Sequence, residues 1–226
     1  MAVPFLFFGL FAIALIAVIV VNFILERRLR EAFAAFAAAE GWSYTPDKNP
    51  AAASSYRFIN RFDHGDNHFL RNRLRGSYAG QEFDMFEYHY QVTSGSGKNR
   101  STTHYHFRVA ATPLPRSFPE LVAGPEGFFD KIAAAFGFDD IDFESAEFSR
   151  TFKVQSPDRK FAYDVIHPRM MEWLMRKPGT TVEIEGPYLV VWETGTLEPD
   201  KVPPLLAHMG GIRERLPAYL LEPEQP

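Results

Sequence analysis

Two stretches of the chain decide its fold: 82-EFDMFEYHYQV-92 and 102-TTHYHFRVAAT-112. In both, apolar and polar side chains alternate with a period of two, which is typical of β-strands with one buried face. Matching the apolar faces of two antiparallel strands sets Tyr88 opposite Phe107. The same register pairs His89 with His106 and Glu87 with Arg108. The polar stretch from Thr93 to Thr102 then forms the loop of a β-hairpin.

A third strand is expected at residues 70–78, where three arginines alternate with Leu and Asn. A two-residue turn at Ala79-Gly80 would bury these three guanidinium groups beside Phe86 and Tyr88, which is costly. A three-residue loop centred on Gly80 avoids this cost, because Gly tolerates the positive φ that such a turn requires. Arg73 is then opposite Glu87 and Arg71 opposite His89. One polar sheet face is predicted, with the residues Arg71, Arg73, Arg75, Glu87, His89, His104, His106 and Arg108.

Three interpretations of this polar face remain open. Antiparallel sheets commonly expose one polar face to solvent, and this needs no function. Clustered arginines favour carboxylate and phosphate, so the face is also a candidate partner-binding surface, formed by Arg71, Arg73, Arg75, His89, His106 and Arg108. The third interpretation is a zinc site, with His89, His104 and His106 as ligands and Glu87 assisting. The neighbouring arginines disfavour a cation there.

The rest of the chain predicts short helices and further strands. Helices are expected near 126–136, at 157–166, after Pro168 and in 200–221, where Gly210-Gly211 and Pro217 interrupt the pattern. Strands are expected around 148–154 and as a hairpin of 180–185 and 188–193. The fold class is therefore α+β: one domain, residues 41–226, with a mostly antiparallel β-sheet and several short helices.

Residues 1–25 contain no charged side chain and are almost wholly apolar from Phe5 onward. A helical run of this length exceeds the ~30 Å hydrocarbon core of a bilayer. We therefore expect a single transmembrane helix at 1–25, with the lipid bilayer as its partner, followed by a juxtamembrane helix at 26–40. The nearby positive charges, Arg27, Arg28 and Arg30, lie on the C-terminal side. This asymmetry predicts an outside N-terminus and a cytoplasmic domain at the cell membrane.

Composition and motifs exclude several classes of function. The formal net charge of -4 and the pI of about 6.0 lack the basic footprint of a nucleic-acid binder. Cysteine is absent, which removes disulfides, thiolate metal sites and cysteine nucleophiles. The segment Ser94–Lys98 is rich in Gly but lacks the spacing of a phosphate-binding loop, and no dinucleotide or metalloprotease motif is present. No cofactor is predicted.

Four motifs follow one another along the chain, and their order and spacing resemble a group of bacterial proteins. They are Gly41-Trp42-Ser43-Tyr44, Leu74–Gly80 leading into Phe86–Tyr90, Glu147–Val154, and His167–Leu174. The group consists of uncharacterised, membrane-anchored proteins that share a domain of unknown function, and the resemblance covers about residues 30–220. It implies no established activity and no catalytic residues. It supports the domain boundary and weighs against an enzyme.

The sequence therefore favours a non-catalytic, membrane-tethered module that binds a membrane-protein partner or assists a membrane complex. Tethering suits such a module because it raises the local concentration at the bilayer. One alternative is a metal-dependent hydrolase that uses His89, His104 and His106. Another is a lipid or small-ligand binding domain, which would need a sizeable apolar cavity among the phenylalanines.

Overall fold

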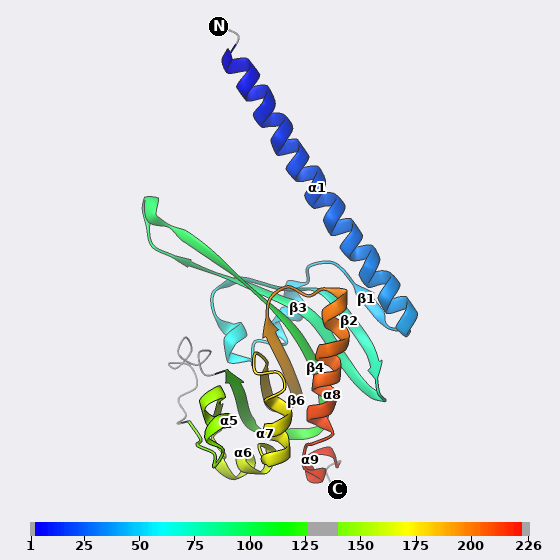
Figure 1. Ribbon diagram of the computed structural model, residues 1–226, viewed down its shortest axis with the longest axis vertical. Coiled ribbons are helices and arrows are strands. Elements are labelled where there is room, and N and C mark those ends of the chain that lie inside the picture. The colour runs from blue at the N-terminus through cyan, green and yellow to red at the C-terminus, as the bar shows by residue number, and fades with distance from the viewer. Residues whose placement is uncertain (1–2, 126–139, 223–226) are drawn as a thin grey trace.

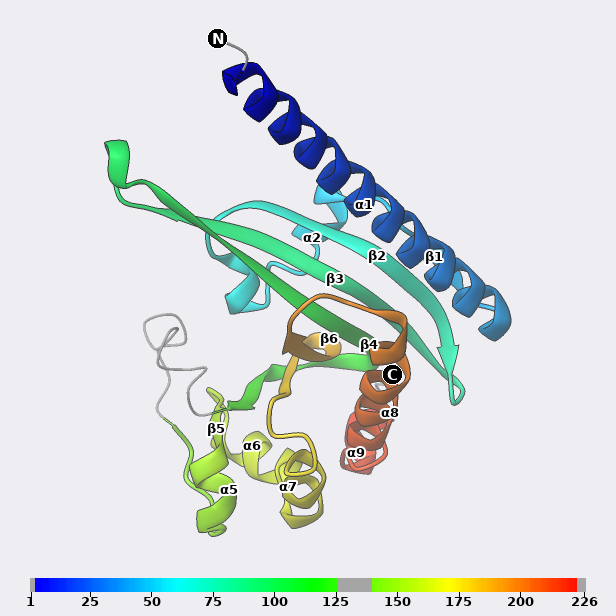
Figure 2. The same cartoon turned by 45° about the horizontal axis from the view of Figure 1, so that its top comes forward.

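The computed structural model describes residues 3–125 and 140–222. Its longest element is helix α1 (Val3–Glu40), which ends before Gly41, where φ is 72°. The N-terminal half of α1 stands clear of the folded body in both views, and its C-terminal half packs against that body (Figure 1; Figure 2). Phe33 and Ala37 are buried in this contact. Within the part of the chain that the structure describes, no helix is both long and apolar enough to cross a membrane.

A six-stranded sheet forms the centre of the domain, and its strand pairs are antiparallel. The strands run in the order β1-β2-β3-β4-β5, and β6 pairs with the other edge of β4. Their bounds are β1 (Ser43–Thr45), β2 (Asp66–Tyr78), β3 (Gln81–Ser94), β4 (Ser101–Pro125), β5 (Phe152–Gln155) and β6 (Thr181–Thr194). The mixed α+β class with an antiparallel sheet is thereby confirmed.

The register predicted for the two defining strands is confirmed. Tyr88 lies opposite Phe107, His89 opposite His106, and Glu87 opposite Arg108. The ladder continues to the pair Ser94 and Ser101, so the loop is shorter than expected and contains the 3₁₀ turn η2 (Gly97–Asn99). Polar side chains can continue a ladder because its hydrogen bonds come from the backbone.

The predicted hairpin at 180–193 is wrong, because β6 is one strand that bends at Gly186, where φ is 54°. Both halves of β6 pair with β4: Leu189 lies opposite Thr112, and Glu183 lies opposite Val122. The register between the two strands shifts at the bend. The long edge of β4 supplies partners for both halves of β6, so the Gly-Pro step produces a bend and not a reversal.

Short helices surround the sheet: α2 (Pro50–Ser54), α5 (Ala146–Thr151), α6 (Arg159–Val165), α7 (Pro168–Leu174), α8 (Val202–Arg213) and α9 (Ala218–Leu221), with 3₁₀ turns η1 (Asn60–Asp63) and η3 (Pro199–Lys201). The strand expected around 148–154 begins only at Phe152, because Ser145 caps α5 by accepting a hydrogen bond from the Phe148 amide. The helix predicted at 126–136 falls outside the described residues.

Helix α8 continues through Gly210-Gly211, where an interruption was predicted. The indole of Trp173 occupies the space that a Cβ of Gly211 would need, and its Nε1 donates a hydrogen bond to the His208 carbonyl over 3.1 Å. The small residue therefore allows α7 and α8 to approach closely and does not end the helix.

Two apolar cores lie on opposite faces of the sheet. One contains Leu74, Met85 and Ala110 and joins the sheet to α1, α7 and α8. The other contains Phe86, Tyr88 and Phe107 and is covered by α2, by η1 and by the segment between them, which contains Ile59. The sheet is therefore covered on both faces over these positions, and the polar side chains among them are removed from solvent.

Candidate functional site

A β-bulge in β2 divides the three predicted arginines between the two faces of the sheet. The turn after Tyr78 is the tight two-residue turn, with Ala79 and Gly80 at φ of 49° and 76°, so the predicted three-residue loop is wrong. The pairing changes parity inside β2, between Arg71 and Leu74, where Asn72 has a φ of 50°. Asn adopts this left-handed conformation more readily than most residues. The bulge places Arg71 opposite Glu87, not opposite His89 as predicted.

Glu87 is the centre of a buried polar network, with 0% of its surface exposed. Its Oε1 accepts hydrogen bonds from Arg71 Nε at 2.9 Å and from His106 Nδ1 at 2.8 Å. Its Oε2 accepts the backbone N–H of Leu197 at 3.0 Å. Both carboxylate oxygens are therefore occupied by donors, which is what makes a buried carboxylate tolerable.

His89 and His104 form a second contact next to this network. His89 is buried, its Nδ1 lies 3.2 Å from the Asn67 carbonyl, and its Nε2 lies 3.1 Å from His104 Nδ1. Burial, followed by the nearby His106, His104 and Lys48, lowers the pKa of His89 to about 4. At neutral pH His89 is therefore a neutral imidazole that stacks on Phe69.

The zinc site that was the third interpretation of the polar face, with His89, His104 and His106 as ligands, is not assembled. In the described residues, the group of ligand atoms that lie within 4.8 Å of one another consists of three glutamates and includes none of these histidines. His106 directs Nδ1 to Glu87, and His89 directs Nε2 to His104. The alternative function as a metal-dependent hydrolase requires these three histidines to converge on one ion, and the described structure does not have this geometry.

Arg108 joins a separate set of polar contacts at the end of the sheet. Its Nη2 donates to the Thr194 carbonyl at 3.2 Å, and its Nε lies 3.7 Å from Glu193 Oε2. The other oxygen of Glu193 accepts a hydrogen bond from Thr180 and forms an ion pair with Lys177. Arg108 thus helps to hold β4 against β6.

Arg73 and Arg75 lie on the face opposite Arg71. Arg73 Nε donates to Asp84 Oδ1 at 2.7 Å, and Tyr56, a member of the core with Phe86, donates to Asp84 Oδ2 at 2.7 Å. Arg75 pairs in register with Asp84 and is exposed. The prediction of one face bearing all three arginines is therefore wrong, because the bulge at Asn72 inverts the side-chain direction.

The six residues predicted to bind a partner consequently do not form one open surface. Arg75 is exposed, His89 is buried, and the other four are half-buried: Arg71, Arg73, His106 and Arg108. Arg71 and Arg73 are ion-paired within the domain. Their binding role stays a prediction, but most of their charge already serves internal contacts.

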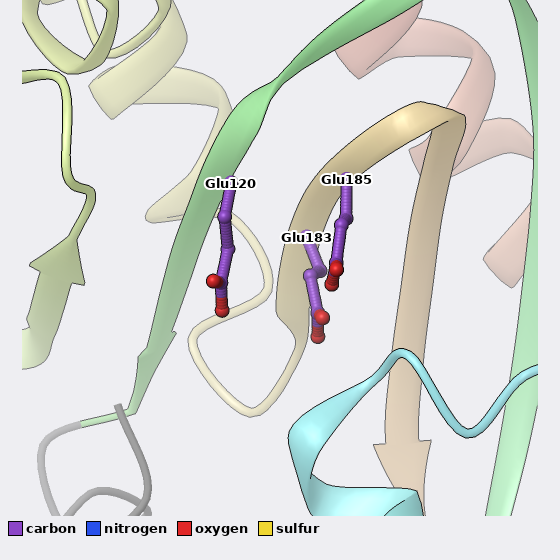
Figure 3. A group of neighbouring side chains, drawn as sticks. All are labelled: Glu120, Glu183 and Glu185. Atoms are coloured by element: carbon purple, nitrogen blue, oxygen red, sulfur yellow. The ribbon is translucent and has the colours of Figure 1, made fainter. Parts of the chain in front are cut away.

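A cluster of three glutamates, which sequence reasoning missed, lies where β4 and β6 run side by side. Glu120 comes from β4, Glu183 and Glu185 come from β6, and the three side chains extend in the same direction (Figure 3). Burial raises the pKa of Glu183 well above its usual range, and the negative charges of Glu185 and Glu120 add to this effect. Burial, followed by the charge of Glu120, raises the pKa of Glu185 to about 7. The available signal was the spacing of Glu183 and Glu185, since residues two apart share a strand face.

A groove between α5, α6 and α7 has a volume of about 760 Å³. Its lining includes the apolar or aromatic side chains Phe143, Phe148, Tyr163, Met171 and Met175. Three exposed glutamates form an acidic rim: Glu144, Glu147 and Glu172. The size is within the range of about 300–1,000 Å³ of ligand pockets. Methionines give such a surface adaptable packing.

Comparisons with known proteins give a likeness in fold alone. No protein-family model matches the chain, and no curated protein matches its sequence. Among solved structures, the chain is similar to the crystal structure of the mycobacterial trehalose monomycolate transport factor A, TtfA, with a TM-score of 0.58 and 12% sequence identity. The similarity covers 88% of this chain and 99% of that chain.

Proposed function

We propose that the chain is a non-catalytic accessory module of a membrane transport complex, tethered to the bilayer by residues 1–25. The observation that carries the proposal is an unpacked apolar surface on α1. Among the described residues, the exposed large hydrophobic side chains run from Phe11 to Leu25, apart from the tyrosines Tyr163, Tyr188 and Tyr219. An apolar surface of this extent is typical of an interaction site, and residues 1–10 of the sequence carry no charge.

The tether is rigidly joined to the domain. Helix α1 continues without interruption from Val3 to Glu40, the ring of Phe33 stacks on Tyr44 at 5.3 Å, and Arg30 forms an ion pair with Asp47. A bilayer that holds the first half of α1 therefore also limits the orientation of the sheet. We propose that the domain lies on the cytoplasmic side, because Arg27, Arg28 and Arg30 follow the apolar run.

Two observations support an accessory role over catalysis. Glu87, His89 and His106 direct polar atoms to internal partners and not into a cleft. The solved structure with a similar fold carries the name of a transport factor, which is the class of role proposed here.

We propose the groove between α5, α6 and α7 as the partner site, and a basic amphipathic segment of a membrane protein as its occupant. Cytoplasmic loops of membrane proteins are rich in Lys and Arg, and the rim of the groove carries Glu144, Glu147 and Glu172. Charge complementarity therefore matches this groove to such a loop. The same rim would repel the headgroup of an anionic lipid, which weighs against the lipid-binding alternative.

The tether is tested by protease protection and alkaline extraction of the full chain in native membranes. We expect the chain to stay with the membrane at high pH, and residues 41–226 to resist protease added to sealed cells. Release into the supernatant, or digestion from outside, would contradict the proposal. Insertion of a Gly-Ser-Gly-Ser linker after Leu25 should keep the chain in the membrane but reduce crosslinking to its neighbours, because the rigid connection is lost.

The partner site is tested with a photo-crosslinking residue at Met171 in intact membranes. We expect Glu144→Lys combined with Glu172→Lys to abolish the crosslinked species, because the rim then repels a basic segment. The matched control is Arg75→Glu, an exposed charge reversal outside the groove, which should leave the species unchanged. Loss with Arg75→Glu alone would favour the arginine surface, and a lipid as the crosslinked species would favour the lipid-binding alternative.

A further inference from the structure

We propose that Glu120, Glu183 and Glu185 form a binding site for a divalent, oxygen-preferring cation of the Ca²⁺ class. The site lies at the β4–β6 pairing and is independent of the groove and of the tether. One ligand atom from each of the three residues lies within 4.8 Å of the others. This upper limit allows any two of the oxygens to lie about 2.4 Å from a common ion, which is within the Ca²⁺–oxygen range of about 2.3–2.6 Å.

A second observation points to a ligand. Only 1% of the surface of Glu183 is exposed, yet its Oε1 accepts no hydrogen bond among the described residues, and neither does the buried Oε2 of Glu185. Buried carboxylate oxygens without donors are rare, because each loses its hydration without compensation. The side chains of Glu183 and Glu185 extend in the same direction as that of Glu120 (Figure 3).

The chemistry of the donors selects the class of ion. Three carboxylates supply hard, anionic oxygen ligands, and no imidazole or thiolate belongs to the group. Ligands of this type suit Ca²⁺, Mg²⁺ and Mn²⁺ better than Zn²⁺ or Cu²⁺. Trp192 lies near enough to Glu183 to affect the pKa of its carboxyl group, so its fluorescence should report occupancy of the site.

The test uses the full chain in detergent micelles, stripped with EDTA and titrated with CaCl₂, MgCl₂ or MnCl₂ at pH 7.5. We expect saturable binding of one ion per chain by equilibrium dialysis, with a matching rise in the melting temperature and a change in Trp fluorescence. Glu183→Gln and Glu185→Gln should each weaken binding more than tenfold. The matched control is Glu82→Gln, an exposed glutamate of β3, which should bind as the wild type does.

The pH dependence and the folding of the variants separate the outcomes. Binding should weaken at pH 5.5, because protons then compete for the carboxylates. If Glu183→Gln does not fold by circular dichroism, Glu185→Gln carries the test. The proposal is overturned if none of the three ions binds or raises the melting temperature at millimolar concentration, or if both folded Gln variants bind as tightly as the wild type. The membrane and partner experiments do not depend on either result.

Discussion

Glu87 and Glu183 lie equally deep in one sheet but are stabilised in different ways. Glu87, on the face shared with Met85, meets an arginine, a histidine and a backbone N–H. Glu183 alternates with Val182 and Ile184 and therefore points to the opposite face, where the charges that act on it are those of Glu185 and Glu120. A buried carboxylate can be held by donors from the protein, or it requires a proton or a metal ion. The donors around Glu87 give it a structural role. The lack of such donors around Glu183 makes it a candidate ligand for a cation.

The largest expected effect comes from removing the charge of Glu87. Glu87→Gln keeps the volume but turns an N–H₂ group toward donors, so that Arg71, His106 or the Leu197 amide loses its acceptor. We expect a loss of about 3 kcal/mol in the free energy of unfolding, the lower end for a broken buried ion pair, because Arg71 and His106 are partly solvated. Urea denaturation of the EDTA-treated protein measures it. A loss below about 1 kcal/mol would show that the network contributes little stability.

The same substitution at Glu183 should have the opposite sign. In EDTA at pH 7.5, Glu183→Gln removes a carboxyl group whose charged form is opposed by burial and by two neighbouring carboxylates. We expect the free energy of unfolding to rise by about 1–2 kcal/mol, as when buried charges are replaced by neutral groups. A clear destabilisation in EDTA would mean that Glu183 has a partner like those of Glu87, and the contrast between the two positions would disappear.

A smaller effect is expected from Arg71→Lys, which keeps the charge but loses the guanidinium contacts with Glu87. Arg71 approaches Glu87 Oε1 through Nε at 2.9 Å and Nη2 at 2.8 Å. A lysine offers one ammonium group in their place, so we expect a loss of about 1 kcal/mol in thermal or urea unfolding. Arg75→Lys, at an exposed position, is the matched control and should change stability by less than about 0.5 kcal/mol.

The stability contributions of the glutamate cluster and of the histidines beside Glu87 should also change in opposite directions with pH. The effect at any single pH is expected to be small. The pKa of Glu185 is raised to about 7. Its contribution to the free energy of unfolding is therefore present below about pH 4.5 and is lost as the pH rises toward 7. The pKa of His89 is lowered to about 4. Its contribution to the free energy of unfolding is therefore present above about pH 6.5 and is lost as the pH falls toward 4.

Urea denaturation in EDTA at pH values between 4.5 and 7 tests the direction of each change in stability. Relative to the wild type, Glu185→Gln should gain stability as the pH rises, and His89→Gln should gain stability as the pH falls. Parallel curves for the wild type and either variant would mean that the group concerned titrates normally in the folded protein.

The strand pattern of residues 82–112 contained enough information to place the centre of the sheet. The strict alternation around Tyr88 and Phe107 has one register that keeps the apolar faces together, and the structure has that register. The end of α1 at Gly41 has a local cause, which is the positive φ of this glycine. The start of α7 has two local causes: the fixed φ of Pro168, and a side-chain acceptor at the N-cap position. The fold class and these boundaries follow from interactions between residues that are near in sequence.

The candidate sites could not be predicted in the same way. The bulge at Asn72 separates Arg71 from Arg73, and nothing near it in the sequence distinguishes a bulge in the strand from a longer turn at Gly80. The burial of Glu87 depends on Leu197, and the glutamate cluster depends on β6 following β4 around a bend at Gly186.

The sequence by itself therefore determined which residues form strands, which faces are apolar and how the two central strands pair, because period and side-chain size act locally. Only the tertiary structure decided which charged groups are buried, which are neutralised and which meet like charges. Those outcomes depend on distances between segments far apart in the chain, and the energy of a charge depends on its distance from other charges and from water.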